Sequence, residues 1–134
     1  MPVSSEWAPR LLSVLRIMAA LLLLQHGTMK LLGFPPGNAP AAMTPSWFAA
    51  WFELIGGGLL LVGLLSRPVA FILSGMCAVA YFMVHFPRGF FPILNGGELA
   101  ALYSFVFLFL SVAGPGPWSA DAVLKRDGKL PAWA

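Results

Sequence analysis

The chain has 134 residues, of which 59% are hydrophobic and only 10% are charged, and its formal net charge is +3 at pH 7. An average soluble domain has about 45 to 50% apolar and 25% charged residues, so this composition excludes an ordinary soluble domain. It predicts an all-α integral membrane protein, a single domain over residues 1–134 in which four transmembrane helices form an antiparallel bundle.

The first predicted helix covers residues 11–32, about the 20 residues that a membrane crossing requires. Its uninterrupted apolar run, residues 17–24, is followed by polar residues rather than a small-residue cleavage site, so we expect it to be retained. His26 and Lys30 share one helix face at i, i+4. Arg16 lies toward the other end, where we expect its side chain to snorkel to the headgroups.

A loop with four prolines and two glycines, residues 33–46, separates this helix from the second, residues 47–65. The second helix contains an acid, Glu53. An unpaired charge near the middle of a bilayer costs roughly 2.5 to 3.5 kcal/mol even on lenient scales, so such an acid usually faces protein and has a partner or a function. Ala49 and Gly57 lie on the same face, and this stripe of small residues allows another helix to approach closely.

The second and third helices are joined by residues 66–68, a link so short that these helices must be antiparallel neighbours. The third helix is predicted over residues 68–86 and the fourth over residues 98–113. The segment between them is typical of the membrane interface. Residues 117–134 form a predicted amphipathic tail with a short helix that starts after Ser119.

Basic residues predict the orientation of the bundle. With four crossings, both termini lie on one side of the membrane, and the opposite loops hold only Arg88, with Lys30 at a helix end. The basic residues on the side of the termini are Arg10, Arg67, Lys125, Arg126 and Lys129. The positive-inside rule therefore predicts that both termini are cytoplasmic.

The polar residues of the spans fall at a similar depth in the outer half of the bundle. They are His26, Lys30, Glu53, His85 and Glu98. Each alone could be a hydrogen-bonded structural residue, but two acids, two histidines and a lysine from four helices favour a functional pocket. Glu98 is equally well placed to stabilise the N-terminus of its own helix.

The single cysteine, Cys77, lies in mid-span and excludes both an intramolecular disulfide and a CxxC redox pair, which favours a buried packing role. The chain has no c-type haem attachment motif and no Glu-x-x-His pair. We therefore expect neither a covalent cofactor nor a metal site. Haem between His26 and His85 is a minor alternative.

Several motifs, in this order, resemble the DoxX family of small four-helix bacterial membrane proteins. They are His26-Gly27-x-x-Lys30-Leu31, Glu53-x-x-Gly56-Gly57, Gly63-Leu64-x-Ser66-Arg67, Asn95-Gly96-Gly97-Glu98, and Gly114-Pro115-Gly116 with Ser119 and Asp121. The resemblance covers roughly residues 16–121 and implies a location in the bacterial cytoplasmic (inner) membrane. It also implies a redox context, because DoxX-like proteins are associated with a quinol oxidase, with thiosulfate:quinone oxidoreductase subunits and with thiol and superoxide detoxification. It supplies no established catalytic residues.

The leading hypothesis is a membrane subunit of a respiratory or quinone-linked oxidoreductase complex, with quinone as the candidate cofactor. In this hypothesis His26 and Lys30 donate hydrogen bonds to a quinone carbonyl, and Glu53 relays a proton with help from His85. These are hypothetical catalytic roles.

The remaining candidate ligand-binding residues lie on the third and fourth helices and the segment between them. Tyr81 and Tyr103 are candidates to pack on a quinone ring, and Glu98 belongs to the same polar layer. An anionic substrate such as a small sulfur oxyanion would instead use Lys30 and Arg88 as charge partners.

The alternative is a non-catalytic structural or assembly subunit, whose polar layer locks the bundle or docks a partner. A transporter is disfavoured, because four helices without an inverted repeat make a small carrier. The expected partners are the lipid bilayer, other membrane or redox-complex subunits and a second copy of the chain, but no nucleic acid. A flavin or an iron-sulfur cluster would have to belong to another chain.

Overall fold

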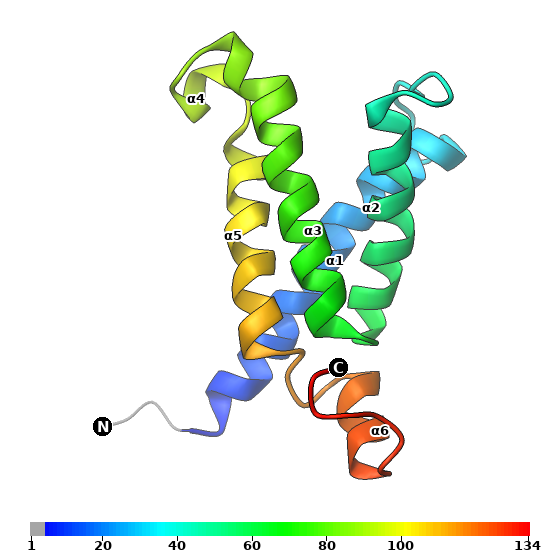
Figure 1. Cartoon of the computed structure of the whole chain (residues 1–134), viewed down its shortest axis with the longest axis vertical. Helices are drawn as coiled ribbons and strands as arrows, with labels where there is room; N and C mark the ends of the chain where they lie inside the picture. The colour runs from blue at the N-terminus through cyan, green and yellow to red at the C-terminus, as the bar shows by residue number, and fades with distance from the viewer. Residues whose placement is uncertain (1–4) are drawn as a thin grey trace.

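A computed structural model describes residues 5–134, which form helices and connecting loops without a strand. The long helices are α1 (Trp7–Leu32), α2 (Pro45–Val62), α3 (Ser66–Ala80) and α5 (Glu98–Ala113) (Figure 1). The short elements are η1 (Tyr81–His85), η2 (Phe86–Arg88), α4 (Pro92–Asn95) and α6 (Ala120–Arg126). The expectation of an all-helical chain is confirmed.

By length and hydropathy, α1, α2 and the continuous segment Ser66–Arg88 are each able to cross a membrane, whereas α5 is apolar but shorter, at 16 residues. Many large apolar side chains point outward, among them Phe71, Phe82 and Phe105, which are 65%, 62% and 71% exposed. An apolar exterior on this scale suits a protein that lipid surrounds.

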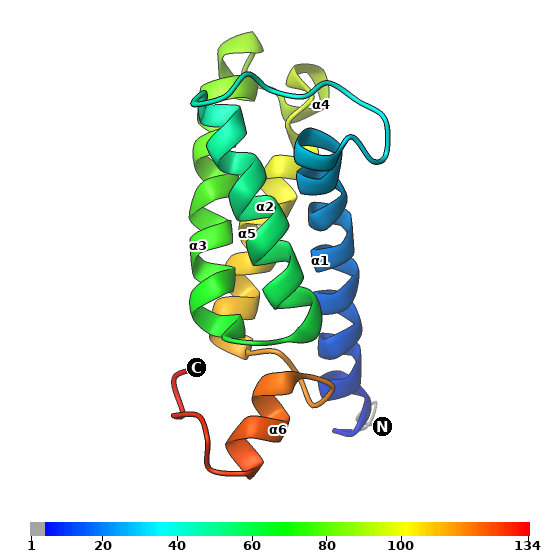
Figure 2. The ribbon, with the colours of Figure 1, turned by 90° about the vertical axis from the view of Figure 1, so that its right-hand side faces the viewer.

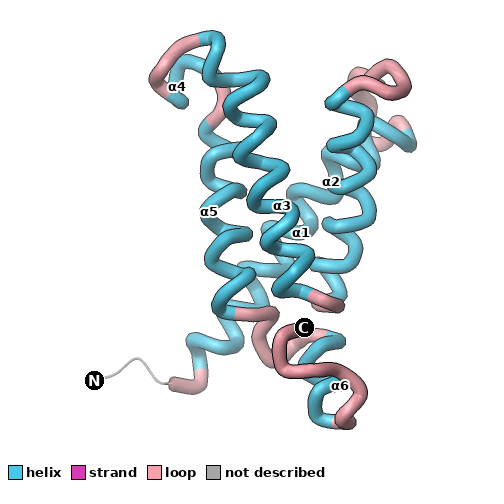
Figure 3. The backbone as a smooth tube through the Cα atoms, viewed as in Figure 1, coloured by secondary structure: helices cyan, strands magenta, loops and turns pink. Residues whose placement is uncertain are grey.

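The long helices form two closely packed pairs, α1 with α2 and α3 with α5. Figure 2 shows all four running along the long axis of the molecule. In Figures 1 and 3 the two pairs lie together at the end near α6 and diverge toward the end that carries α4. We call these the α6 end and the α4 end. The buried core joins the pairs through Leu23, Leu60, Leu73 and Phe107.

Glycines set the close approach of α1 to α2. A Cβ on Gly27 would lie 2.6 Å from the Leu54 backbone nitrogen, and a Cβ on Gly57 would lie 3.2 Å from the Leu24 Cα. Gly56 faces α3 instead, where a Cβ would lie 2.8 Å from a methyl group of Leu73. The prediction that small residues beside Glu53 allow a helix to approach is therefore confirmed.

Three helix starts differ from the prediction. Helix α1 begins at Trp7 rather than at 11, and the other two starts differ by two residues each. Helix α2 begins at Pro45 rather than at 47, because the Thr44 hydroxyl accepts a hydrogen bond from the Trp47 N–H at 3.3 Å. Helix α3 begins at Ser66, so the link between α2 and α3 is residues 63–65 rather than 66–68.

The third predicted helix changes geometry along its length. It is α-helical only to Ala80, continues as a π-helical turn over η1, and tightens to a 3₁₀ turn over η2 before Gly89. Pro87 lies in that last turn, where it lacks an N–H for a further α-helical hydrogen bond. The fourth predicted helix, by contrast, has the same bounds as α5.

Arg16 does not snorkel to the headgroups, and that expectation is wrong. Its side chain is 1% exposed, and its two terminal nitrogens donate to the carbonyl oxygens of Pro115 at 2.6 Å and Trp118 at 2.7 Å. These carbonyls follow the end of α5 and have no helical partner, so the guanidinium satisfies them. Arg16 thus ties α1 to the turn that follows α5.

Asp121 makes a second long-range contact at the α6 end. Its two carboxylate oxygens accept hydrogen bonds from the backbone N–H groups of Leu65 and Ser66, each at 2.8 Å, and the side chain is fully buried. The expected tail helix is present as α6, with the Ser119 hydroxyl accepting from the Ala122 N–H at 3.1 Å. Asp121 therefore caps α3 from the tail, where the two N–H groups lack partners within their own helix.

Candidate functional site

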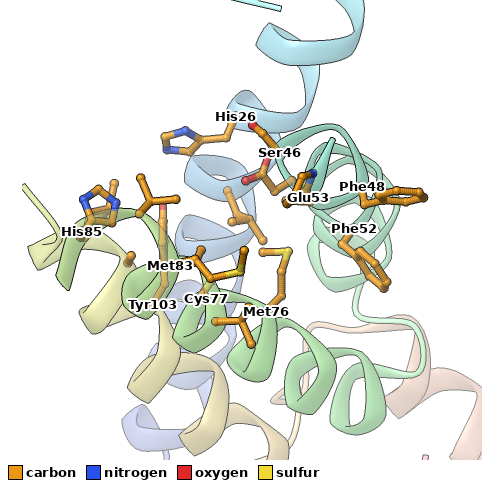
Figure 4. Close-up of a pocket in the computed structure, with 18 of the residues that line it drawn as sticks. His26, Ser46, Phe48, Phe52, Glu53, Met76, Cys77, Met83, His85 and Tyr103 are labelled. Atoms are coloured by element: carbon orange, nitrogen blue, oxygen red, sulfur yellow. The ribbon is translucent and has the colours of Figure 1, made fainter. Parts of the chain in front are cut away.

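A pocket with a volume of about 750 Å³ lies between the two helix pairs, toward the α4 end. Side chains of α1, α2, α3, η1 and α5 line it, and most of them are apolar (Figure 4). Its lining residues come from both pairs, and the pairs diverge toward this end (Figure 1). The pocket therefore lies at the depth where the sequence predicts the polar layer.

Lys30 and Glu53 form an ion pair in the wall of this pocket. The Lys30 Nζ atom lies 2.8 Å from Glu53 Oε1 and 2.9 Å from Oε2, and Glu53 is 7% exposed. Gly27 lies one helical turn before Lys30 and allows the α1 backbone to touch the Glu53–Leu54 backbone. Because residue 27 has no Cβ, α1 can approach α2 closely enough for the ammonium group to reach the buried carboxylate.

Two histidines line the same pocket from different elements. His26 lies one turn before Lys30 on α1 and is half-buried. His85 ends the π-helical turn, and its Nδ1 atom lies 3.2 Å from the carbonyl oxygen of Asn95. Figure 4 shows His26, His85 and Glu53 around the pocket, which α1, η1 and α2 position.

Asn95 is a buried residue whose role the sequence did not reveal. It is 2% exposed; its Nδ2 donates to the Tyr81 hydroxyl at 3.2 Å and to the Gly89 carbonyl at 2.9 Å, and its Oδ1 accepts from the Gly97 N–H at 2.8 Å. A Cβ on Gly97 would lie 2.7 Å from the side chains of Tyr81 and His85. The Asn95-Gly96-Gly97 motif was the sequence signal that could have pointed to these contacts. In the structure, Asn95 and Gly97 pack against His85 beside the pocket.

Tyr103 lines the pocket from α5 and is 6% exposed. Its ring is parallel to that of Phe107, with centroids 5.4 Å apart and planes 9° apart. Its hydroxyl oxygen has no hydrogen-bond partner among residues 5–134. Cys77 lines the same pocket, is 4% exposed and belongs to the buried core, as expected of a packing cysteine.

The structure thus gathers His26, Lys30, Glu53, His85 and Tyr103 around one pocket.

Three other predicted ligand-binding residues are not among its lining residues. Tyr81 stacks on His85, with ring centroids 6.3 Å apart, and its hydroxyl accepts a hydrogen bond from the Asn95 side-chain amide. Arg88 and Glu98 are exposed at the α4 end, with Glu98 in the first turn of α5. Glu98 therefore has the position expected of a partner for the helix dipole.

Sulfur and aromatic side chains complete the lining. Met76 comes from α3, Met83 comes from η1, and Phe48 and Phe52 come from α2. Within residues 5–134, no three His, Cys, Asp or Glu side chains gather as ligands of a metal ion would.

Comparison with known proteins agrees with the motifs. The DoxX family model matches residues 11–86. An uncharacterized protein of Haemophilus influenzae is 42% identical over 123 residues, which cover 87% of this chain and 92% of that protein. A second uncharacterized protein of the same organism is 32% identical over 101 residues, covering 75% of this chain and 66% of that protein. No solved structure matches. With more than half of its length matched by the family model, this membrane protein belongs to the DoxX family.

Proposed function

We propose that this protein is a quinone-binding membrane subunit of a respiratory or quinone-linked oxidoreductase complex. The observation that carries the proposal is the Lys30–Glu53 ion pair in the wall of an apolar pocket at membrane depth. Intramembrane ionisable groups that line a cavity commonly mark a ligand site or a proton path.

The rim of the pocket supports a lipophilic ligand. Phe48 and Phe52 of α2 and Ile72 of α3 line the pocket and are also 46%, 49% and 52% exposed on the apolar exterior. The pocket is thus bordered by side chains that face the bilayer, so a molecule dissolved in lipid can reach it between α2 and α3. Its volume of about 750 Å³ lies within the range of roughly 300 to 1,000 Å³ typical of small-molecule sites.

The polar groups of the pocket fit a quinone headgroup. Lys30 and His26 are hydrogen-bond donors for a carbonyl oxygen, and Glu53 is a carboxylate that can take up or release a proton beside it. A bound quinone would supply the redox chemistry. The chain would bind and orient it, hold a proton at the Glu53 carboxylate, and exclude water with the apolar lining. A partner subunit would exchange the electrons.

In the same proposal, α1, α2, the segment Ser66–Arg88 and α5 cross the bacterial inner membrane as an antiparallel bundle with both termini in the cytoplasm. The short link 63–65 and the basic residues at the α6 end support this arrangement.

Two glycines offer a matched test of quinone binding. Gly75 lines the pocket and Gly58 does not, and a Cβ would meet nothing within 4 Å at either position. We expect wild type and Gly58→Leu, purified in mild detergent, to retain quinone detectable by extraction and absorbance, whereas Gly75→Leu should lose it. Wild type without quinone, or equal retention by Gly75→Leu, would overturn the proposal.

A non-catalytic assembly subunit is the second candidate, and the ion pair itself favours it. Lys30 neutralises Glu53 and thereby joins α1 to α2, which a purely structural polar layer would also do. Mass spectrometry of the same preparations separates the candidates, because a stoichiometric membrane partner without quinone is the result expected of an assembly role.

A further inference from the structure

The Tyr103 hydroxyl is a buried polar group that lacks a partner. Its oxygen has less than 1 Å² of exposed surface and no hydrogen bond to residues 5–134. A hydroxyl buried without a partner costs free energy, and native proteins rarely keep one without a reason. Replacing Tyr103 with Phe would remove that cost and keep the ring, so packing alone does not explain the hydroxyl.

Tyr103 differs from the other buried side chains with an unpaired atom. The other three atoms within the described residues are the Nε atoms of Arg16 and Arg67 and the Oγ of Ser66. The guanidiniums of Arg16 and Arg67 donate elsewhere, to carbonyl oxygens that include those of Pro115 and Val112. None of these three residues lines the pocket, whereas Tyr103 does.

The surroundings of Tyr103 favour a hydrogen bond over ring stacking with a ligand. One face of its ring is covered by the parallel ring of Phe107. Figure 4 shows Tyr103 and His85 on one side of the pocket and Glu53, Phe48 and Phe52 on the other. The hydroxyl is therefore a polar group placed across the pocket from the ion pair.

We propose that binding of the lipophilic ligand exposes the Tyr103 hydroxyl to the pocket, where it donates a hydrogen bond to an oxygen of the ligand and thereby orients it. The inference rests on the proposed function for the identity of the ligand as a quinone, but the hydrogen bond requires only a lipid-soluble molecule with an accepting oxygen. It assigns Tyr103 a binding role distinct from the ring packing that the sequence suggested.

The Tyr103→Phe variant, which lacks the hydroxyl, tests the inference through two measurements: the unfolding temperature should not fall, whereas the affinity for the ligand should. In ligand-depleted protein, Tyr103→Phe should leave the unfolding temperature unchanged or raise it, because an unpaired buried hydroxyl is removed. The same variant should bind a short-chain ubiquinone about three- to tenfold more weakly, as loss of one hydrogen bond implies. Equilibrium dialysis in detergent measures the affinity.

Ser74→Ala is the matched control. The Ser74 hydroxyl is also buried between α3 and α5, but it already donates to the Ser104 carbonyl at 2.7 Å and does not line the pocket. We expect its deletion to lower the unfolding temperature and to leave quinone affinity unchanged. If Tyr103→Phe lowers the unfolding temperature as Ser74→Ala does, the Tyr103 hydroxyl is already paired and the inference fails.

A second probe, an isoprenoid ketone, distinguishes this inference from the proposed function. If the ketone binds with an affinity that depends on Tyr103 while quinone does not bind, the quinone assignment fails and the hydrogen-bonding role stands. If quinone binds equally to wild type and Tyr103→Phe, the proposed function stands and the inference is overturned. If neither probe binds wild type, both are overturned.

Discussion

The Lys30 ammonium contacts both carboxylate oxygens of Glu53, at 2.8 and 2.9 Å, and joins two helices through residues 23 positions apart. The Lys30 and Glu53 side chains are 19% and 10% exposed. Water can therefore solvate them only a little, and each charge offsets most of the desolvation cost of the other. Neither residue is an independent site. They form one polar unit in the pocket wall.

This contact predicts strong thermodynamic coupling between the two residues. We expect Lys30→Met to destabilise the protein more than Glu53→Gln, because it leaves a buried carboxylate unpaired. In a double-mutant cycle the coupling free energy should be roughly 0.5 to 3 kcal/mol, measured by unfolding in detergent. Additive effects would show that the ion pair does not form in solution. Loss of turnover in a normally folded Glu53→Gln protein would indicate that its proton takes part in chemistry.

Close packing at Gly27 predicts that even one added methyl group disturbs this ion pair. Gly27→Ala places a Cβ 2.6 Å from a backbone nitrogen that cannot easily move, so α1 must shift away from α2. We expect destabilisation of about 1 to 3 kcal/mol, as for overpacked cores.

Gly58→Ala provides the control for this change. Gly58 lies on α2 with nothing within 4 Å of an added Cβ, and alanine there should stabilise the helix by roughly 0.5 to 1 kcal/mol. Thermal unfolding of both variants in one detergent measures the difference. A Gly27→Ala protein as stable as Gly58→Ala would contradict the close approach of the helices.

Regular periodicity made much of the fold predictable. Helix α5 has its predicted bounds because Glu98 and Gly114 mark its ends locally, and His26 and Lys30 share a face at i, i+4. The start of α3 was harder to predict, because its capping carboxylate, Asp121, lies 55 residues later in the chain. Local sequence shows where a helix can form, but it does not show which distant group caps it.

The candidate site was predictable only in part for a similar reason. The spacing of Glu53 and the glycines indicated an inward face. At the opposite end of the bundle, outside the site, the partners of Arg16 are backbone carbonyls of residues 115 and 118. Backbone acceptors carry no signal in the sequence. The hydrogen bonds of Asn95 likewise depend on loop geometry at Gly89 and Gly97, which periodicity does not encode.

Cys77 should be dispensable for assembly and activity. Its thiol is buried in the core at 4% exposure, so Cys77→Ala removes only a small packing group, and we expect a loss of about 1 kcal/mol in stability. Turnover or ligand binding per folded molecule should remain close to wild type. A large loss of activity in a well-folded variant would instead indicate thiol chemistry in the pocket.

The proposed orientation predicts the sides from which exposed positions can be labelled. In a Cys77→Ala background, Lys129→Cys in the tail and Asn38→Cys in the loop between α1 and α2 each introduce one exposed thiol. An impermeant maleimide should label Asn38→Cys in cells whose outer membrane has been permeabilised. Lys129→Cys should react only after the inner membrane is also opened. Reaction of Lys129→Cys before that step would reverse the topology.

Removal of the Asp121 carboxylate should release the start of α3. The side chain accepts hydrogen bonds from the Leu65 and Ser66 N–H groups at 2.8 Å each, and both donors would lose these partners in Asp121→Ala. A lost cap and buried unpaired donors together predict destabilisation of about 1 to 3 kcal/mol. Asp121→Asn should cost less, because its amide oxygen can still accept one bond.

The position of Asp121 makes this effect specific to the contact between the tail and the bundle. Asp127 lies near the end of the same tail helix but its side chain is 42% exposed, so Asp127→Ala should change the unfolding temperature little. Hydrogen exchange provides the local readout: the amides of residues 65 and 66 should lose protection in Asp121→Ala while those in the middle of α1 keep it. Uniform loss of protection would mean that Asp121 supports the whole fold. Retained protection at residues 65 and 66 would mean that the carboxylate does not cap α3.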